Sequence, residues 1–499
     1  MLEFVDESLR DGPQSLWATR MRTQSMLAVA PLLNRVGFNK ACVASGASFE
    51  TAVKFLHESP WERVQLLNAA MPDTPIDILI RSRNLFGWER YPNEVIDLLF
   101  RCLKRAGASS VKIFDGLNDI DNIAAAFPIA LANGLQPAGL LAFSLSPVHT
   151  DAHFAQKARE FVRAGATSII ITDASGLLSG DRARQLIAAV KEAVDGAVPL
   201  EFLAHHTMGL AHDSYREALK AGIRKVTTAC TPLANGESLP GTLDILSIAH
   251  ELGIATSLDE EALRRADDLL HWVAYKEGHP LAEPVCFDPV HFQAFAGHQI
   301  PGGMISNFRR QLAELGLMHR LDEVLEEAAR VRLELGCPIM VTPFSQFVGV
   351  QATFNIIQGE RYRTVPRELM LYALGHYGKS PGPIDPDVLD RILKGRNPDT
   401  VDVKLVFDAA VLADFRKTHG PFASDEELLL HMFYGADPVE TMKRNKTIIS
   451  GLPTVDKPLT ALVRELSCHR GFHRFSLEHR DVRITMTQQE DVQYERRMA

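Results

Sequence analysis

The sequence is poor in cysteine and lacks long apolar runs. Six cysteines are spread over 499 residues without a CxxC pair, which argues against a disulfide framework and against a zinc ribbon. No apolar run reaches the ~18 residues of a membrane span, and Glu3, Asp6 and Glu7 are acidic where a signal peptide would be basic. We therefore expect a cytoplasmic protein that does not insert into a membrane.

Clusters of basic residues and glycine-rich phosphate loops are also missing. The formal net charge is −9 and the basic residues are scattered among acids, so no nucleic-acid-binding surface is predicted. The absence of a GxGxxG or P-loop motif argues against a doubly wound nucleotide-binding sheet. The 46% hydrophobic and 23% charged residues are typical of a globular protein, and 499 residues are enough for more than one domain.

Short apolar segments rich in β-branched residues alternate with segments of helical periodicity. This alternation is typical of a parallel sheet wrapped in helices. Because about eight strand-and-helix units close into a barrel, the sequence predicts an α/β fold of the (β/α)₈ or TIM-barrel type. The expected strands begin near residues 2, 40, 76, 111, 138, 168, 200 and 225.

The residues after the expected barrel have a different pattern. Longer helical stretches, such as LDEVLEEAARVRLELG from Leu321, predict a mainly helical region. The segment FHRFSLEHRDVRITMTQ, from Phe472, alternates like a β-ribbon. We therefore predict a barrel domain over residues 1–300, a helical extension packed on the barrel over residues 301–452, and a polar arm over residues 453–499.

Polar side chains that follow the expected strands form the candidate site, because the active sites of TIM barrels lie at the carboxyl ends of the strands. The Arg81 guanidinium could hold a substrate carboxylate, or form a salt bridge across the rim. Asp11 and His205 can bind a divalent metal, although a structural role is the simpler interpretation of His205. Asp115 is expected either to orient a neighbouring basic residue or to contact substrate. The full set is Arg10, Asp11, Gln14, Arg81, Asp115, Asn118, Thr172, Asp173, His205 and His206.

Several longer motifs follow one another through residues 1–433. They are LRDGPQSLWATRMRT (residues 9–23), SPWERVQLL (59–67), FDGLND (114–119), SPVHT (146–150), IPGGMISN (300–307) and VTPFSQFVGVQA (341–352). In kind and in order, these motifs resemble those of the carboxyltransferase domains of pyruvate carboxylase, oxaloacetate decarboxylase and transcarboxylase.

The resemblance implies a function and a site. In that family a divalent metal in the barrel lies beside the substrate, and a carboxyl group passes between carboxybiotin and a 2-oxo acid such as pyruvate, or oxaloacetate is decarboxylated. It implies that Asp11 and His205 are metal ligands and that Ser306 relays a proton. Arg10, Gln14 and Arg81 would hold the 2-oxo acid. Because the sequence has no Met-Lys-Met biotin-acceptor motif, any biotin would come on a separate carrier or biotin carboxylase subunit.

The sequence departs from the family at the metal site. Thr172 stands where the family has a lysine that becomes a metal ligand, and Leu203 stands where it has a histidine. Two of four expected ligands are thus replaced, and neither Thr nor Leu substitutes for them. Glu201 and His206 are alternative ligands, and we expect an empty or weak metal site rather than a filled one. Trp88 replaces a tyrosine that would face the substrate.

Three functions are compatible with these observations. The first is a carboxyltransferase or decarboxylase acting on a small 2-oxo acid, as part of a biotin-dependent complex. The second is a repurposed carbon–carbon lyase or aldolase-like enzyme on the same barrel. The third is a non-catalytic subunit that assembles with a carboxylase partner. In each case we expect a homo-oligomer. The retained Arg10, Asp11, Gln14 and Arg81 favour an enzyme, whereas the lost ligands favour the second and third functions.

Overall fold

The structure is a computed structural model that describes residues 1–300, 312–313, 316–394, 409–445, 474–479 and 482–487. The chain divides into two compact units, Met1–Gly451 and Leu452–Ala499. Among the described residues, no helix combines the length and the hydropathy that crossing a bilayer requires. The further division of the first unit into a barrel domain and a helical extension stays a prediction.

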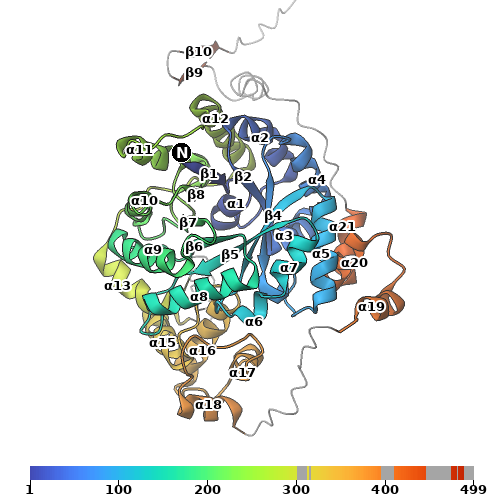
Figure 1. Cartoon of the computed structure of the whole chain (residues 1–499), viewed down its shortest axis with the longest axis vertical. Coiled ribbons are helices and arrows are strands. Elements are labelled where there is room, and N and C mark those ends of the chain that lie inside the picture. The colour runs from blue at the N-terminus through green and yellow to red at the C-terminus, as the bar shows by residue number, and fades with distance from the viewer. Residues whose placement is uncertain (301–311, 314–315, 395–408, 446–473, 480–481, 488–499) are drawn as a thin grey trace, which may run out of the picture. The chain divides into compact units, whose positions relative to one another are not determined.

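The first unit is built around a closed barrel of eight parallel strands in sequence order, which confirms the predicted fold class. Figure 1 shows these strands in the centre with helices around them. β4 starts three residues before its expected start at Val111, because Ala108 already pairs with Ile76 of β3. The strands are β1 (Glu3–Asp6), β2 (Lys40–Ser45), β3 (Ile76–Arg81), β4 (Ala108–Phe114), β5 (Gln136–Ala142), β6 (Ser168–Asp173), β7 (Leu200–Ala204) and β8 (Lys225–Thr228).

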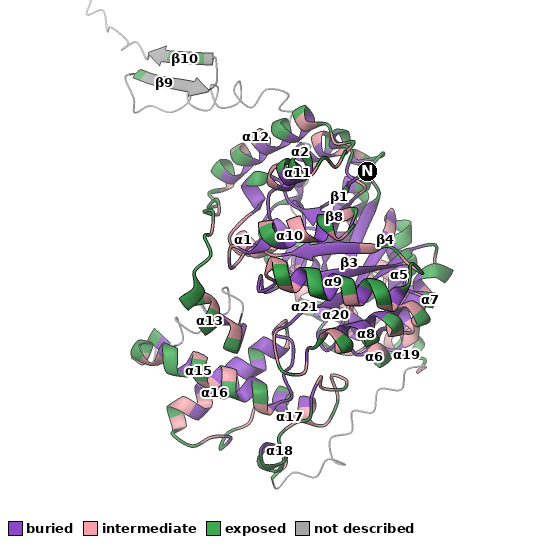
Figure 2. Cartoon of the chain, turned by 60° about the vertical axis from the view of Figure 1, so that its left-hand side comes forward, coloured by how far each residue is buried: buried purple, intermediate pink, exposed green. Residues whose placement is uncertain are grey.

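Both faces of the strands are buried, which explains their continuous apolar sequence. All residues of β6 are buried. Ile169 and Ile171 point outward into the main core beneath the helices, whereas Ile170 points inward into a separate apolar cluster inside the barrel. Figure 2 shows the same division, with buried strands in the centre and helices whose outer faces are exposed.

Helices follow every strand and form the outer layer of the barrel. Their sequences place apolar residues at helical spacing, and several end at a glycine in the left-handed conformation, such as Gly37 after α2 (φ 83°). These helices are α1 (Asp11–Leu16), α2 (Thr23–Val36), α3 (Gly46–Thr51), α4 (Pro60–Ala70), α5 (Asn93–Arg105), α6 (Ile120–Ile123), α7 (Ala126–Ala132), α8 (Asp151–Ala164), α9 (Gly180–Val194), α10 (Ala211–Lys220), α11 (Thr242–Glu251) and α12 (Glu260–Glu277).

The helices that follow the barrel pack on it in two places. The pair α15 and α16 contributes to a second apolar core, and the buried Arg332 of α15 donates a hydrogen bond to Ser144, which follows β5. α20 and α21 lie beside α5 in Figure 1, where the Trp61 indole donates to the Glu426 carbonyl oxygen. These helices are α13 (Pro289–His298), α15 (Leu321–Glu334), α16 (Phe344–Gln358), α17 (Arg367–Ala373), α18 (Pro386–Leu393), α19 (Leu412–His419), α20 (Asp425–Tyr434) and α21 (Ala436–Arg444).

The described part of the second unit is an antiparallel hairpin of β9 (Arg474–His479) and β10 (Val482–Thr487). The alternating sequence from Phe472 predicted this β-ribbon, and the structure confirms it.

Candidate active site

A cavity of about 410 Å³ opens at the carboxyl ends of the barrel strands. Its wall is formed by the ends of β3 to β7 and by the segments that follow β1, β2 and β8, with Val341 and Thr342 reaching in from the segment before α16. The structure brings six of the predicted site residues to this cavity, from four different strand ends. They are Arg10, Asp11, Gln14, Arg81, Thr172 and His205.

Two acidic side chains bind the guanidinium of Arg10. It donates from Nε to Glu7 Oε2 at 2.6 Å and from Nη1 to Asp11 Oδ1 at 2.9 Å. Among the described residues, Nη2 makes no hydrogen bond, so this nitrogen is left to face a ligand. Glu7 is itself fixed by the buried Lys112, whose Nζ lies 2.6 Å from Glu7 Oε1. The guanidinium therefore has a set orientation before any substrate binds.

Gln14 is oriented by a residue from the next strand. Ser45, the last residue of β2, donates from its hydroxyl to Gln14 Oε1 at 2.9 Å. With the carbonyl end of the amide occupied, the Nε2 group is directed to the cavity as a donor, and it makes no hydrogen bond to the described residues.

Arg81 ends β3, two strands away from β1 in the barrel, and its guanidinium makes no hydrogen bond to the described residues. Its charged group stacks on Trp88, with 4.9 Å between Cζ and the ring centroid. Trp88 in turn donates to Glu50. Gly46 lets the guanidinium approach, because a Cβ at this position would lie 3.3 Å from Arg81 Nη2. Burial lowers the pKa of Arg81 and Glu50 acts against this, so the group stays cationic and is available to bind an anion.

Asp11 and His205 bind each other. His205 Nε2 lies 3.3 Å from Asp11 Oδ1, and Nδ1 lies 2.9 Å from the Glu237 carbonyl oxygen. Both ring nitrogens thus face acceptors, which requires a proton on each. Burial alone would lower the pKa of His205, but the Asp11 carboxylate raises it above its ordinary value. A doubly protonated imidazole has no lone pair for a metal.

The residues of the barrel mouth do not fit the divalent metal that the family resemblance implies. Thr172 turns its hydroxyl to the Ile170 carbonyl oxygen, and Leu203 offers no ligand atom. Asp11 and His205 alone leave most of a coordination shell unfilled. In the part of the chain that the structure describes, the one group of three side chains close enough to share a metal lies elsewhere, on α20 and α21, and consists of Glu427, His431 and Glu440.

The two alternative ligands considered from the sequence lie outside the cavity. Glu201 is buried deeper in the barrel, where it accepts from Ser168 and pairs with Lys40. His206 packs its ring against His212 at a centroid distance of 4.4 Å, and burial together with His212 lowers the pKa of His206 to about 4. Neither residue completes a metal site.

Asp115 and Asp173 organise loops rather than line the cavity. Asp115 accepts hydrogen bonds from the backbone N–H groups of Leu117 and Asp119 and from the Asn122 side chain, and burial raises its pKa to about 6. These hydrogen bonds hold a loop and an amide side chain, and the choice between orienting a basic residue and contacting substrate stays a prediction. Asp173 accepts from two backbone N–H groups in the turn after β6. Ser306 lies outside the described residues.

Glu7 and Ser45 are the site residues that sequence reasoning missed. Glu7 lies three residues before Arg10 at the end of a strand, and an acid at this spacing is a signal for a paired arginine. Ser45 ends β2 where the strand-end rule would also have listed it. Their roles depend on which strands are neighbours, which only the closed barrel determines.

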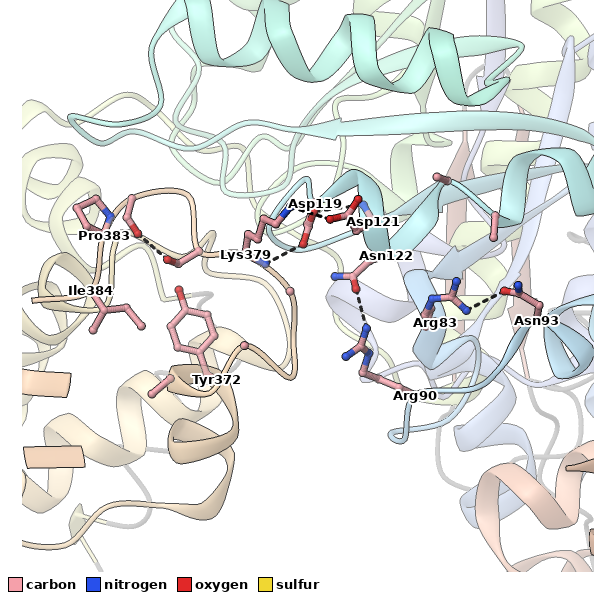
Figure 3. Close-up of a pocket in the computed structure, with 17 residues that line it drawn as sticks. Arg83, Arg90, Asn93, Asp119, Asp121, Asn122, Tyr372, Lys379, Pro383 and Ile384 are labelled. Carbon is pink, nitrogen blue, oxygen red and sulfur yellow. Dashed lines mark hydrogen bonds and ion pairs between the residues drawn. The ribbon is translucent and has the colours of Figure 1, made fainter. Parts of the chain in front are cut away.

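A larger hollow, of about 960 Å³, lies at the seam between the barrel and the segment after α17. Figure 3 shows its charged side chains bound to one another: Lys379 reaches Asp119 through its backbone and Asp121 through its ammonium group, and Arg90 binds Asn122. Because Lys379 is already paired with Asp119 and Asp121 across the seam, we interpret this hollow as the docking surface of the two regions and the barrel mouth as the site.

Comparison with known proteins identifies the family. The chain is 36% identical over 404 residues to a pyruvate carboxylase subunit of Methanocaldococcus jannaschii, an alignment that covers 80% of this chain and 70% of that protein. The chain belongs to the carboxyltransferase family. It is also 33% identical over 382 residues to the methylmalonyl-CoA carboxyltransferase 5S subunit of Propionibacterium freudenreichii. This alignment covers 76% of the present chain and 74% of that protein.

The structural comparison agrees with this family assignment. The carboxyl transferase domain of Rhizobium etli pyruvate carboxylase, solved with pyruvate and biocytin, superimposes with a TM-score of 0.81 at 25% identity, covering 91% of this chain and 79% of that one. A family model described as a conserved carboxylase domain matches residues 296–492 of the carboxyltransferase-family chain, and one described as HMGL-like matches residues 139–270.

Proposed function

We propose that this chain is the carboxyltransferase component of a biotin-dependent complex and that its barrel mouth binds a small 2-oxo acid. The observation that supports this most strongly is the pairing, across one cavity, of an anion-binding Arg81 with the preoriented donors of Arg10 and Gln14. The relatives support the same class, since they include subunits of a pyruvate carboxylase and of a 2-oxoglutarate carboxylase.

Arg81 binds the substrate carboxylate. Its guanidinium is positively charged, faces the cavity and has no hydrogen bond to the described residues, so a carboxylate can take two of its N–H groups in a bidentate pair. The indole of Trp88 shields one face of this pair from water. Because the fork is planar, it also fixes the plane of the bound 2-oxo acid.

Arg10 and Gln14 supply donors for the oxygen that becomes negative when the enolate forms. Arg10 Nη2 and Gln14 Nε2, in the segment after β1, are donors that make no hydrogen bond to the described residues. Donors that are already oriented stabilise a developing oxyanion without reorganisation, and this effect is often the largest in catalysis. No metal ion is part of this proposal, since the residues present do not hold one. Ser306 keeps its predicted role as proton relay.

The carboxyl group would come from carboxybiotin on a separate carrier subunit. The cavity has room for a second reactant, because 410 Å³ corresponds to roughly a dozen water molecules, more than a small 2-oxo acid fills. Ser15 and Thr342 add hydrogen-bonding groups at its wall. Decarboxylation of oxaloacetate by the same pocket is the reverse direction of this chemistry. The cytoplasmic setting and the homo-oligomeric state stay predictions.

The test is the release of pyruvate from oxaloacetate by the purified chain, with free biotin as carboxyl acceptor. Wild type should exceed the uncatalysed rate, and Arg81→Met should lose roughly 10- to 100-fold of that excess, because a charge-assisted pair disappears. Arg101→Met, which changes a half-exposed arginine on the outer helix α5, is the matched control and should retain the rate. No acceleration by wild type would favour the non-catalytic role, and equal accelerated rates for wild type and Arg81→Met would contradict Arg81 as the carboxylate anchor.

A further inference from the structure

The wall of the barrel mouth next to Arg81 is apolar. Leu79, Phe114, Leu140 and Leu203 line the cavity, and we call these four residues the apolar patch. They belong to or pack against a hydrophobic cluster inside the barrel that is separate from the main core. Leu140 and Leu203 are buried, whereas Leu79 and Phe114 are only half-buried. Apolar surface therefore stays open to the cavity, as is typical of a ligand-binding wall.

The strand register places the apolar patch beside the carboxylate anchor. Arg81 on β3 pairs with Phe114 on β4, and Phe114 pairs with Leu140 on β5. Because neighbouring strands lie ~4.8 Å apart, the patch begins one strand away from the backbone of Arg81. Leu79 precedes Arg81 by two residues and faces the same side of β3. A ligand held by its carboxylate at Arg81 thus has its other end within reach of the patch.

The same wall offers little to a second acidic group. Leu203 and its register partner Thr172 stand where the family resemblance implies polar metal ligands, and Thr172 turns its hydroxyl to its own strand. The lining residues Asp11 and Glu50 are acids and would repel a further carboxylate. His205 is already bound to Asp11, and the remaining Nη2 group of Arg10 is assigned to the enolate oxygen in the proposed function. This lining favours an uncharged, apolar substituent.

We propose that the barrel mouth takes a 2-oxo acid whose side chain is apolar and longer than a methyl group, with its carboxylate on Arg81 and its side chain on the apolar patch. This inference rests on the proposed function and adds the substrate class to it. The carbon next to the keto group must still carry a hydrogen for carboxylation, so straight-chain and branched aliphatic 2-oxo acids are the compounds that fit.

The test is calorimetric titration of the full chain with pyruvate, 2-oxobutanoate, 4-methyl-2-oxopentanoate and 2-oxoglutarate. Burial of each added methylene should tighten binding about fourfold until the patch is covered. We expect 4-methyl-2-oxopentanoate to bind at least tenfold tighter than pyruvate and 2-oxoglutarate to bind more weakly than 2-oxobutanoate. The inference is overturned if pyruvate or 2-oxoglutarate binds as tightly as 4-methyl-2-oxopentanoate.

Variants of the patch separate this inference from the proposed function. Leu203→Asn should reduce the affinity ratio of 4-methyl-2-oxopentanoate to pyruvate at least threefold, and Leu79→Thr, at a half-buried position, tests the same ratio if Leu203→Asn does not fold. Leu131→Asn on the outer helix α7 is the matched control and should keep the wild-type ratio. If the folded patch variants keep the wild-type affinity ratio, only the inferred substrate class is contradicted. If Arg81→Met binds every 2-oxo acid as tightly as wild type does, the proposed function is contradicted.

Discussion

The two ends of the barrel interior hold charged residues in opposite ways. Deep in the barrel, Lys112 lies 2.6 Å from Glu7 and 3.3 Å from Asp77, and Lys40 bridges Asp77 and Glu201, so each charge has opposite charges around it. At the mouth, four residues after Asp77 on β3, Arg81 has no acid in hydrogen-bonding contact among the described residues. The paired charges deep in the barrel can only stabilise the fold. The mouth, where hydrogen-bond donors have no partner among the described residues, can bind a ligand.

The largest effect is expected from a substitution among the paired charges deep in the barrel. Lys112→Met would remove the buried cation that Glu7 and Asp77 share. The two acids would keep only their pairs with Arg10 and Lys40, which should lower the free energy of unfolding by roughly 3–5 kcal/mol. Chemical denaturation measures this change. Lys220→Met removes a half-exposed partner of Glu217 and should cost less than about 1 kcal/mol. If both variants are equally stable, the deep charges are not the tightly coupled network described above.

A smaller effect is expected at the mouth, and on turnover rather than on stability. Gln14→Leu removes an oriented donor and should slow oxaloacetate decarboxylation roughly 100-fold with little change in the melting temperature. Ser45→Ala keeps the Gln14 amide and removes only the hydrogen bond that orients it, so we expect the decarboxylation rate to fall by less than about tenfold. A Ser45→Ala variant as slow as Gln14→Leu would mean that the serine itself contacts substrate.

Metal removal should have the smallest effect. Because His205 is held by Asp11 and by a backbone carbonyl group, overnight dialysis against a chelator should change neither decarboxylation nor the melting temperature. Elemental analysis of the purified chain should find far less than one zinc or manganese per chain. Stoichiometric metal, with activity that a chelator abolishes and added metal restores, would show that Asp11 and His205 separate to bind it.

The sequence was sufficient to predict the barrel and six of the ten residues proposed at its strand ends. Segments buried on both faces are recognisable by their unbroken apolar character, as in β2 and β6, and the strand-end rule places Arg10, Arg81 and His205 together.

The pairings within the site could not be predicted in the same way. Contacts such as Ser45 with Gln14 or His205 with Asp11 join segments far apart in the chain, and they depend on strand register and side-chain rotamers. Leu203 illustrates the difference. The family resemblance implied that a metal ligand was lost at this position. Only the register of β3, β4 and β5 shows that Phe114 and Leu140 follow Arg81 across the neighbouring strands.

The stacking of Trp88 on Arg81 has a practical consequence. The indole is about half-exposed, at 47%, and its ring lies against the one cation that we expect a substrate to neutralise. Indole fluorescence responds to nearby charge, so the emission of Trp88 should shift when an anion docks. The barrel mouth would then report its own occupancy, without any dye or coupled reaction.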